Sequence, residues 1–573
     1  HHLHPTPWFP FSNPRLGPAR AILPLGAPTA CAKLTRMETL LRVQQGLLRG
    51  NCSLPQGDVC FFGAIPFASP PIGTLRWQPP QLPSPWTGER DATRLGPQCL
   101  QMEDPDSPPL GVESCLFLNV WTPTACLEQG GCATMLWIHG GGYTIGSGIN
   151  YDGAADASLA ADVIVVTTNY RLHAFGFLVD SVSHGESTGN FGLQDQREAM
   201  RWLRTNVASF GGNGRLTIVG ESAGASSISC HLCAPASRGL FSAAAMESGA
   251  FPFWSARSLA AARKQRETLL HATGCSDQAC LLAFDAANLT TIAGDGRLFG
   301  NTSGKLYAAS WAPTVDGMEL AAQPTELLVR NECARVPLLL GVNRDEGTSS
   351  ANAPSEPLLQ RGFNMSGAEL RAFLDSWLPN QTAVARASQL YAVGSSPLYS
   401  SPYWAAVHFL GDVLFTCPAL HAARQFDALT APGAAPTDRG AAAPVFLYWF
   451  DHPPRDPPFD ADVPGFNGSA GVSHAFEMQF VWQGLPQSLW APYGALVGAE
   501  EYLLSRTIAA YWTNFVRSAD PNVGTRTSMT RDWPRVGSND SVSAGGISAL
   551  ELRLPTPSVV SGRAEAQCAF IDQ

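Results

Sequence analysis

The sequence predicts an α/β fold, with a large, mostly parallel central sheet and helices on both of its faces. Near-continuous apolar, β-branched runs recur along the chain, as expected for strands buried on both faces of a parallel sheet. These runs are ATMLWIHG (133–140), ADVIVVTTNYR (161–171), LTIVG (216–220), VPLLLGVNRDEG (336–347) and VFLYWFD (445–451). Segments with helical periodicity lie between them, and this alternation of strands and helices favours parallel pairing.

Two segments show the helical periodicity most clearly. Residues 192–210 carry apolar side chains at helix-like spacing, namely Leu193, Ala199, Trp202, Leu203 and Val207. Residues 499–522 predict a second helix near the C-terminus, which Asp520 and Pro521 end. Both helices fit the covering layers of the predicted sheet.

The composition of the chain changes near Val43, and this change sets the expected domain organisation. We expect residues 1–42 to form an irregular or signal-like N-terminal segment, and residues 43–573 to form one domain without internal repeats. The low-complexity stretch 429–444 is expected to be a flexible surface insertion within that domain.

The overall composition excludes several classes of function. Hydrophobic residues make up 45% of the 573 residues and charged residues 15%, which is typical of a compact globular protein. The net charge of −10 argues against a nucleic-acid partner or an anionic membrane surface. No run of 18 or more apolar residues occurs, so no membrane-spanning segment is expected. Nothing in the pattern predicts the oligomeric state.

Fourteen cysteines indicate an oxidising compartment, with secretion or residence in the lumen of the secretory pathway. The alternative is a set of scattered buried thiols. Asn-x-Ser/Thr sequons favour a secreted glycoprotein, although each motif is short and weak by itself. They begin at Asn51, Asn288, Asn301, Asn364, Asn380, Asn467 and Asn539.

The motif GESAG, residues 220–224, follows an apolar strand and precedes a helix, which is the pattern of a nucleophile elbow. Such a turn forces a strained backbone on Ser222, and we expect its φ to be positive. Side chains at 220 and 224 would collide with the turn, and glycine at both positions removes that collision. The alternative is a glycine-rich turn with an incidental serine.

A serine nucleophile needs a base and a site for the oxyanion. The run LWIHGGGY, residues 136–143, ends a strand in three glycines whose N–H groups are free to converge on one oxygen. We expect the oxyanion donors to be the N–H groups of Gly141 and Gly142, with Ala223 as the third. The alternative is a plain flexible glycine loop.

The chain resembles the type-B carboxylesterase/cholinesterase family of α/β hydrolases from Val43 to the C-terminus, and motif order and spacing match throughout. The matching motifs are FFGAIPFASPPIGTLRW, ESCLFLNVWTP, WIHGGGY, NYRLHAFGFL, GNFGLQDQREAMRWLRTNVASFGGN, GESAG, GVNRDEG, GVSHAFEMQFVW and YWTNFVRSADPN. The resemblance implies the α/β-hydrolase fold and hydrolysis of carboxylic esters. It also implies an acyl-enzyme intermediate, with no cofactor and no metal.

The resemblance implies that Glu346 is the acid and His474 the base of a triad with Ser222. The order serine, acid, histidine matches that of α/β hydrolases. Glu346 also directly follows an apolar strand, at the kind of strand end where such folds build sites. Glu221 is adjacent to the serine and is expected to line the substrate pocket instead of serving as the acid. Because His474 must be neutral to act as base, activity is expected to fade as the pH falls through about 6.5.

Further roles are implied by the same resemblance. Trp254 aligns with an acyl-pocket aromatic residue, although a plain core tryptophan is the alternative, and Glu477 aligns with a glutamate that supports the triad. The implied disulfides are Cys99–Cys115, Cys275–Cys280 and Cys417–Cys568. Sequence spacing alone suggests Cys52–Cys60 and Cys126–Cys132. Cys31, Cys230, Cys233 and Cys333 remain unassigned, and packing is the favoured interpretation of Cys230 and Cys233.

Three functions are therefore compared. The first is a secreted serine carboxylesterase that acts on small or medium esters. The second is a lipase-like or cholinesterase-like relative that prefers long-chain or choline esters. The stretch between Cys99 and Cys115 has no aromatic residue to bind a quaternary ammonium group, which argues against choline esters. The third is a non-catalytic adhesion protein, which typically lacks a triad member, whereas all three members are present here.

Overall fold

The computed structural model describes residues 38–52, 58–102, 107–151, 154, 162–180, 189–295, 298, 311–348, 364–428, 443–453, 471–483, 496, 498–537 and 546–572. Several sequence predictions lie outside these residues. They are most of the N-terminal segment, Cys31, nearly all of the low-complexity stretch 429–444, and the sequons at Asn301, Asn467 and Asn539.

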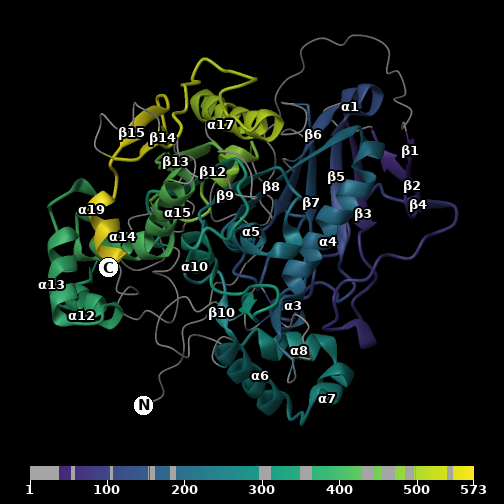
Figure 1. Cartoon of the computed structure of the whole chain (residues 1–573), viewed down its shortest axis with the longest axis horizontal. Helices are drawn as coiled ribbons and strands as arrows, with labels where there is room; N and C mark the ends of the chain where they lie inside the picture. Colours follow the sequence, from purple (N-terminus) through teal and green to yellow (C-terminus); the bar gives the residue numbers. More distant parts are fainter. Residues whose placement is uncertain are drawn as a thin grey trace, which may run out of the picture.

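A central sheet of 13 strands organises the described part of the chain (Figure 1). Seven of its strands run parallel as neighbours in the order β7, β6, β8, β9, β12, β13 and β14. Their bounds are Val163–Thr168, Cys132–Ile138, Gly212–Glu221, Ala243–Glu247, Leu338–Asn343, Val445–Phe450 and Ser548–Leu552. Each of the five apolar runs of the sequence overlaps one of these strands, so the predicted mostly parallel sheet is confirmed.

Antiparallel strands extend the sheet at both ends. On one side lie β1 (Glu38–Val43), β2 (Gly46–Asn51), β3 (Val59–Pro66) and β5 (Phe117–Pro123), and on the other side lies β15 (Ser558–Ser561). The short β4 (Glu89–Asp91) is an exception, because it pairs in parallel with β2. The prediction of irregular structure up to Arg42 is wrong for β1. This strand has little periodic pattern of its own and is fixed by antiparallel pairing with β2, from Glu38↔Asn51 to Val43↔Gly46.

Helices cover both faces of the sheet, and side chains of β6 show why both faces need cover. Met135 and Trp137 belong to a core that includes residues of α17 (Gly498–Ser518), whereas Leu136 and Ile138 belong to a second core that includes residues of α4 (Phe191–Asn206) and α5 (Ala223–Cys233). Successive side chains of a strand point to opposite faces, so a strand buried on both faces is apolar throughout. Figure 1 shows α17 and the pair α4 and α5 on different sides of the sheet.

The remaining helices and short strands lie around this sheet. Those named here are η1 (Gly73–Leu75), α1 (Thr124–Gln129), α3 (His173–Phe177), η2 (Val207–Phe210), η3 (Pro235–Ser237), β10 (Arg257–Ser258), α6 (Leu259–Thr273), α7 (Gln278–Ala283), α8 (Ala286–Ala293), β11 (Thr314–Val315), α10 (Pro324–Val329), α12 (Gly367–Trp377), α13 (Gln381–Leu390), η5 (Pro397–Tyr399), α16 (Met478–Val481) and α19 (Glu565–Ile571).

One long helical segment within the described ranges is apolar enough to be tested as a membrane span. It runs over Pro402–Ala428 through α14 (Pro402–Gly411), the π-helical turn η6 (Asp412–Thr416) and α15 (Cys417–Ala428). Of its most apolar window, 83% is buried inside the protein. A core helix passes the same test of length and composition, so this helix is weak evidence for a span.

Six disulfides occur among the described residues. They are Cys52–Cys60, Cys99–Cys115, Cys126–Cys132, Cys233–Cys333, Cys275–Cys280 and Cys417–Cys568. Packing was the wrong interpretation of Cys233, whereas Cys230 is a buried thiol. Cys233 and Cys333 are 100 residues apart, and they meet only because the end of α5 packs beside α10.

A buried ion pair joins α4 to the segment after β7 and gives a test of the packing. Arg171 donates two hydrogen bonds of 2.7 Å to the carboxylate of Asp195, and both side chains are 2% exposed or less. Asp195→Ala leaves a buried guanidinium without its partner, so we expect the free energy of unfolding to fall by about 3–5 kcal/mol. Denaturant unfolding measures this change.

The exposed pair Arg526–Asp532 provides the matched control, because the Asp532 side chain is 85% exposed. Asp532→Ala should change the free energy of unfolding by less than about 1 kcal/mol. Equal losses of unfolding free energy in the two variants would show that burial of the Arg171–Asp195 pair does not set the size of the destabilisation.

Candidate active site

Ser222 lies in the one-residue turn between β8, which ends at Glu221, and α5, which begins at Ala223. Its φ of 54° and ψ of −119° confirm the expected positive φ, which costs free energy in any residue with a side chain. Hydrogen bonds hold the strained turn: the N–H of Ser222 donates to Glu247 O at 2.9 Å, and its carbonyl accepts from Ser226 N at 2.8 Å. The Ser222 side chain stays partly exposed and reachable.

The two glycines of the motif let the turn pack against the end of β6. A Cβ atom at position 224 would lie 2.0 Å from the carbonyl oxygen of Ile138, and one at position 220 would lie 2.7 Å from the same atom. Both distances are shorter than any van der Waals contact. The obstacle to a side chain is therefore the neighbouring strand as well as the turn itself.

Glu346 and His474 come together across 128 residues of sequence. The Nδ1 atom of His474 lies 2.7 Å from Glu346 Oε2 in a hydrogen bond. Glu346 follows β12 in a tight turn, and its side chain is 1% exposed. Among the described residues Ser222 Oγ makes no hydrogen bond with His474, a contact that often tightens only when substrate binds.

The second oxygen of Glu346 is held by two further donors. Oε1 accepts from the hydroxyl of Ser248 at 2.6 Å and from the backbone N–H of Asn343 at 2.7 Å. Three hydrogen bonds therefore fix the carboxylate that faces His474. Ser248 was missed in the sequence, although it directly follows β9, and polar residues at the carboxyl ends of parallel strands are candidates for a site.

Glu221 lies on the opposite edge of the His474 ring from Glu346. Its Oε1 atom is 3.2 Å from His474 Nε2, but the two atoms are not aligned as a hydrogen bond, and Oε1 has no hydrogen-bond partner in the described part of the chain. Burial raises the pKa of Glu221 to about 8, with smaller contributions from Glu477 and Glu346, while His474 lowers it. The structure thus places Glu221 beside Nε2, away from the Nδ1 atom that a triad acid contacts.

The carboxyl groups around His474 control its charge. Burial by itself lowers the pKa of His474, but the carboxylates of Glu221 and Glu346 outweigh it and raise the pKa from 6.5 to about 9. The neutral imidazole therefore forms at a higher pH than the sequence-based expectation of about 6.5.

The glycine loop after β6 presents free N–H groups next to the elbow. Gly141 and Gly142 have φ values of +97° and +61°, which a residue with a side chain adopts only with strain. Within the described ranges, the N–H groups of Gly141, Gly142 and Ala223 donate to no acceptor. Thr144 N and Ile145 N both donate to Gly141 O at 3.0 Å and close the loop. The three candidate oxyanion donors are thus unpaired.

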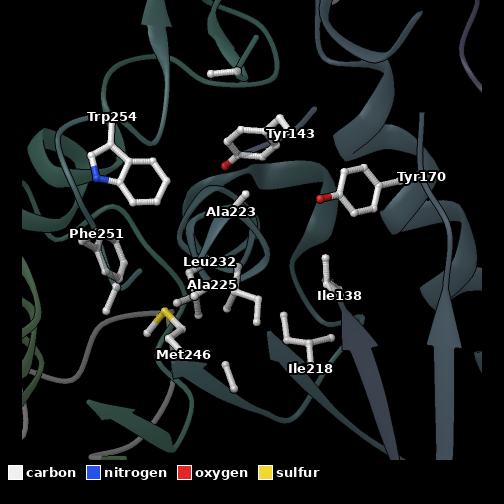
Figure 2. Close-up of a cluster of buried hydrophobic side chains, with 14 of the residues drawn as sticks. Ile138, Tyr143, Tyr170, Ile218, Ala223, Ala225, Leu232, Met246, Phe251 and Trp254 are labelled. Atoms are coloured by element: carbon white, nitrogen blue, oxygen red, sulfur yellow. The ribbon is translucent and has the colours of Figure 1, made fainter. Parts of the chain in front are cut away.

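Aromatic side chains connect Trp254 to the histidine. The Trp254 ring packs edge to face on Phe415 at 5.9 Å between centroids, and Phe415 packs on the His474 ring at 4.6 Å. Trp254 is 6% exposed, and its Nε1 donates to Leu414 O at 3.2 Å. Figure 2 shows Trp254 and Phe251 on one side of Ala223 and Tyr170 on the other. Trp254 is therefore both a core residue and a neighbour of the elbow helix.

Glu477 shares hydrogen-bond partners with Glu346 and, in the described part of the chain, makes no hydrogen bond with His474. Its carboxyl accepts from Asn343 Nδ2 at 2.5 Å and from Tyr448 OH at 3.3 Å, and Ser248 Oγ lies 3.4 Å away. Burial, followed by the charge of Glu346, raises the pKa of Glu477 to about 7. Ser248 and Asn343 each contact both carboxyl groups, so they join Glu477 to the acid.

Other histidines near the site have structural partners. His139 stacks on Tyr170 at 4.3 Å between ring centroids, and His231 hydrogen-bonds Ser237 and Gln196 at 2.9 Å each. Within the described part of the chain, no three side chains of His, Cys, Asp or Glu gather in a way that could hold a metal ion.

Comparisons with known proteins agree with this geometry. The model of the carboxylesterase family matches residues 37–558. Cholinesterase of Mus musculus is 32% identical over 569 residues, covering 94% of this chain and 87% of that protein, and acylcarnitine hydrolase of Mus musculus is 33% identical over 488 residues, covering 80% and 79%. Among solved structures, a thermophilic PNB esterase has a TM-score of 0.74 and 27% identity, and a PNB esterase has 0.71 and 28%. Each alignment covers 93% of this chain and all of the other.

The contact between Glu221 and His474 can be tested by titration. Glu221→Gln removes a carboxylate 3.2 Å from Nε2, so the pKa of His474 should fall from its raised value toward 6.5. NMR of protein with 13C-labelled histidine rings measures this pKa, and His474→Gln assigns the signal.

Glu326→Gln is the matched control, because Glu326 is 54% exposed and, among the described residues, forms an ion pair only with Arg330. This variant should leave the pKa of His474 as it is. An unchanged pKa in Glu221→Gln would contradict the assigned cause of the shift.

Proposed function

The chain belongs to the carboxylesterase family and is a carboxylic ester hydrolase, and we propose that Ser222, His474 and Glu346 form its catalytic triad. One observation carries the assignment: the 2.7 Å hydrogen bond between His474 Nδ1 and Glu346 Oε2 lies beside a strained elbow that presents Ser222. Because Glu346 occupies Nδ1, the Nε2 atom of the ring is left to exchange protons with the serine.

In the proposed acylation step, His474 Nε2 takes the proton of Ser222 Oγ as that oxygen attacks the ester carbonyl carbon. The imidazolium that forms is stabilised by Glu346, which stays ionised. His474 then gives the proton to the leaving alcohol, and the acyl group stays on Ser222. A water molecule, activated by the same imidazole, attacks the acyl-enzyme and releases the acid.

The unpaired N–H groups of Gly141, Gly142 and Ala223 support a role in binding the oxyanion. Donors fixed by the backbone need no rearrangement when negative charge develops, and loss of one such donor typically costs about 100- to 1,000-fold in kcat. The N-terminus of α5 adds the favourable end of its dipole to the same place. The strain at Ser222 thus brings nucleophile and donors to one point.

The two further glutamates have different proposed roles. Glu221, 3.2 Å from Nε2, lines the pocket beside the reacting atoms and adds negative potential where the imidazolium forms. Within the described ranges, Glu477 makes no hydrogen bond with either ring nitrogen of His474, and it supports Glu346 through Ser248 and Asn343. We infer that Glu477 is a positioning residue.

Small or medium esters are the proposed substrates. Trp254 packs on Phe415, and Phe415 packs on the His474 ring, which favours a closed acyl pocket over a long open groove. The two mouse relatives carry the names cholinesterase and acylcarnitine hydrolase, and both names refer to esters of quaternary-ammonium alcohols. In this chain the loop closed by Cys99–Cys115 has no aromatic residue to bind such a cation.

We also propose a domain organisation for the chain and a cellular compartment for the protein. A single sheet runs from β1 to β15, which supports one catalytic domain that includes β1 and so starts before the expected Val43. Six disulfides support residence in an oxidising compartment, either in the lumen of the secretory pathway or outside the cell. The sequons make glycosylation part of this expectation.

Covalent labelling tests the nucleophile. A fluorophosphonate should react with one residue, and mass spectrometry of the digested protein should place the adduct on Ser222. Ser222→Ala should abolish labelling and reduce kcat by about 1,000-fold or more. Ser395→Ala, at an exposed serine, is the control and should behave as wild type. Full activity in Ser222→Ala would overturn the triad.

A matched pair of substrates tests the alcohol preference. Butyrylcholine and 3,3-dimethylbutyl butyrate have the same shape, and only the first carries a positive charge. A desolvated cation–π site contributes about 2 kcal/mol, or roughly 30-fold. We expect kcat/KM values within about threefold of each other, together with a decline in kcat/KM from butyrate to laurate among p-nitrophenyl esters. A tenfold or greater preference for butyrylcholine, or for laurate, would contradict the proposed substrate class.

A further inference from the structure

We propose that Asp345 is a positioning residue that fixes the backbone bearing His474 and so aligns its imidazole with Ser222. The inference rests on the proposed triad and concerns the residue just before its acid. Asp345 itself touches neither reacting atom. It acts through the three residues that precede His474 in the chain.

Asp345 binds Val472 through both its backbone and its side chain. The N–H of Asp345 donates to Val472 O at 2.9 Å, and the N–H of Val472 donates to Asp345 Oδ2 at 2.7 Å. Asn343, on the same turn, donates from Nδ2 to Ser473 O at 2.8 Å. The turn that carries Glu346 therefore holds the backbone of both residues directly before His474.

The carboxylate of Asp345 is itself held in place. Its side chain is 2% exposed, and Arg344 donates to it from Nε at 3.0 Å and from a terminal nitrogen at 2.8 Å. His408 Nε2 lies 3.4 Å from the other oxygen, Oδ1. These partners fix the buried carboxylate, so it offers Val472 an acceptor in one position.

Gly471 permits this close approach. A Cβ atom at position 471 would lie 2.2 Å from Asp345 Oδ2, and the φ of Gly471 is +66°. Glycine is therefore required where the carboxylate passes the chain. This accounts for the glycine three residues before His474, a part of the GVSH motif that the chemistry of the triad leaves unexplained.

The turn that carries Asp345 and Glu346 thus fixes both the orientation of the His474 ring and the position of the His474 backbone. Glu346 orients the ring through Nδ1, and Asp345 places the backbone from which that ring extends. Without the carboxylate, Val472 N–H loses its acceptor, and the segment is held less firmly by the remaining hydrogen bonds from Asp345 N–H and Asn343. A displacement of about 1 Å in a reacting group can cost on the order of 100-fold in rate. The effect should therefore fall on kcat, with KM little changed.

Variants of Asp345 test the inference when kcat is expressed per reactive site. The concentration of sites is obtained by titration with a fluorophosphonate, so any unfolded fraction drops out. We expect kcat per site to fall by about tenfold in Asp345→Asn, which keeps one acceptor oxygen, and by about 100-fold in Asp345→Ala. The low-field NMR signal of the proton between His474 Nδ1 and Glu346 should shift or broaden in both variants.

Asp451→Asn is the matched control. Asp451 accepts from the same Arg344 at 2.5 Å and is 7% exposed, and in the part of the chain that the structure describes it makes no hydrogen bond or ion pair with residues 471–474. Its kcat per site should stay within about twofold of wild type. Equal kcat per site in Asp345→Asn and Asp451→Asn, with an unchanged low-field signal, would overturn the inference even if Asp345→Ala fails to fold. Failure of the wild type to label at Ser222 would instead overturn the proposed function.

Discussion

The site depends on one hydrogen bond, the 2.7 Å contact between His474 Nδ1 and Glu346 Oε2. It joins segments that are 128 residues apart, and the sheet makes the meeting possible. Parallel strands place their carboxyl ends on one edge, so β6, β8, β9 and β12 deliver in turn the glycine loop, Ser222, Ser248 and Glu346 to the same region. His474 is then held against this edge by the turn that carries its acid.

Burial of charge distinguishes this site from an ordinary pair of histidine and carboxylate. Burial raises the pKa of Glu221, Glu247 and Glu477, so each of these groups resists ionisation. Around His474 the balance is reversed, because nearby carboxylates outweigh the effect of burial and raise its pKa. In the proposed mechanism, the electrostatic environment that stabilises an imidazolium during acylation therefore also favours the protonated resting form of His474. The proposed catalysis therefore needs a His474 pKa that is high enough to stabilise the imidazolium during acylation and low enough to leave the resting imidazole neutral.

Local sequence pattern predicts the parts of this protein that are determined locally. Apolar runs mark the parallel strands, and the glycines around Ser222 mark the elbow, because strand burial and turn sterics act within a few residues. Glu346 and His474 could be assigned only through family resemblance. β1, Ser248, the Cys233–Cys333 disulfide and the contact of Glu221 with Nε2 were missed. Each of these depends on residues brought together by the fold, and no spacing in the sequence reports such a meeting.

The central claim is that the strained elbow, the glycine loop and the histidine converge on one reacting centre. A crystal structure of the protein after reaction with a phosphonate ester tests this most directly. The account predicts phosphorus bonded to Ser222 Oγ, and its phosphoryl oxygen 2.7–3.1 Å from the backbone nitrogens of Gly141, Gly142 and Ala223. It also predicts that His474 Nδ1 remains bonded to Glu346. An adduct on another residue, or a phosphoryl oxygen that points away from the glycine loop, would contradict the account.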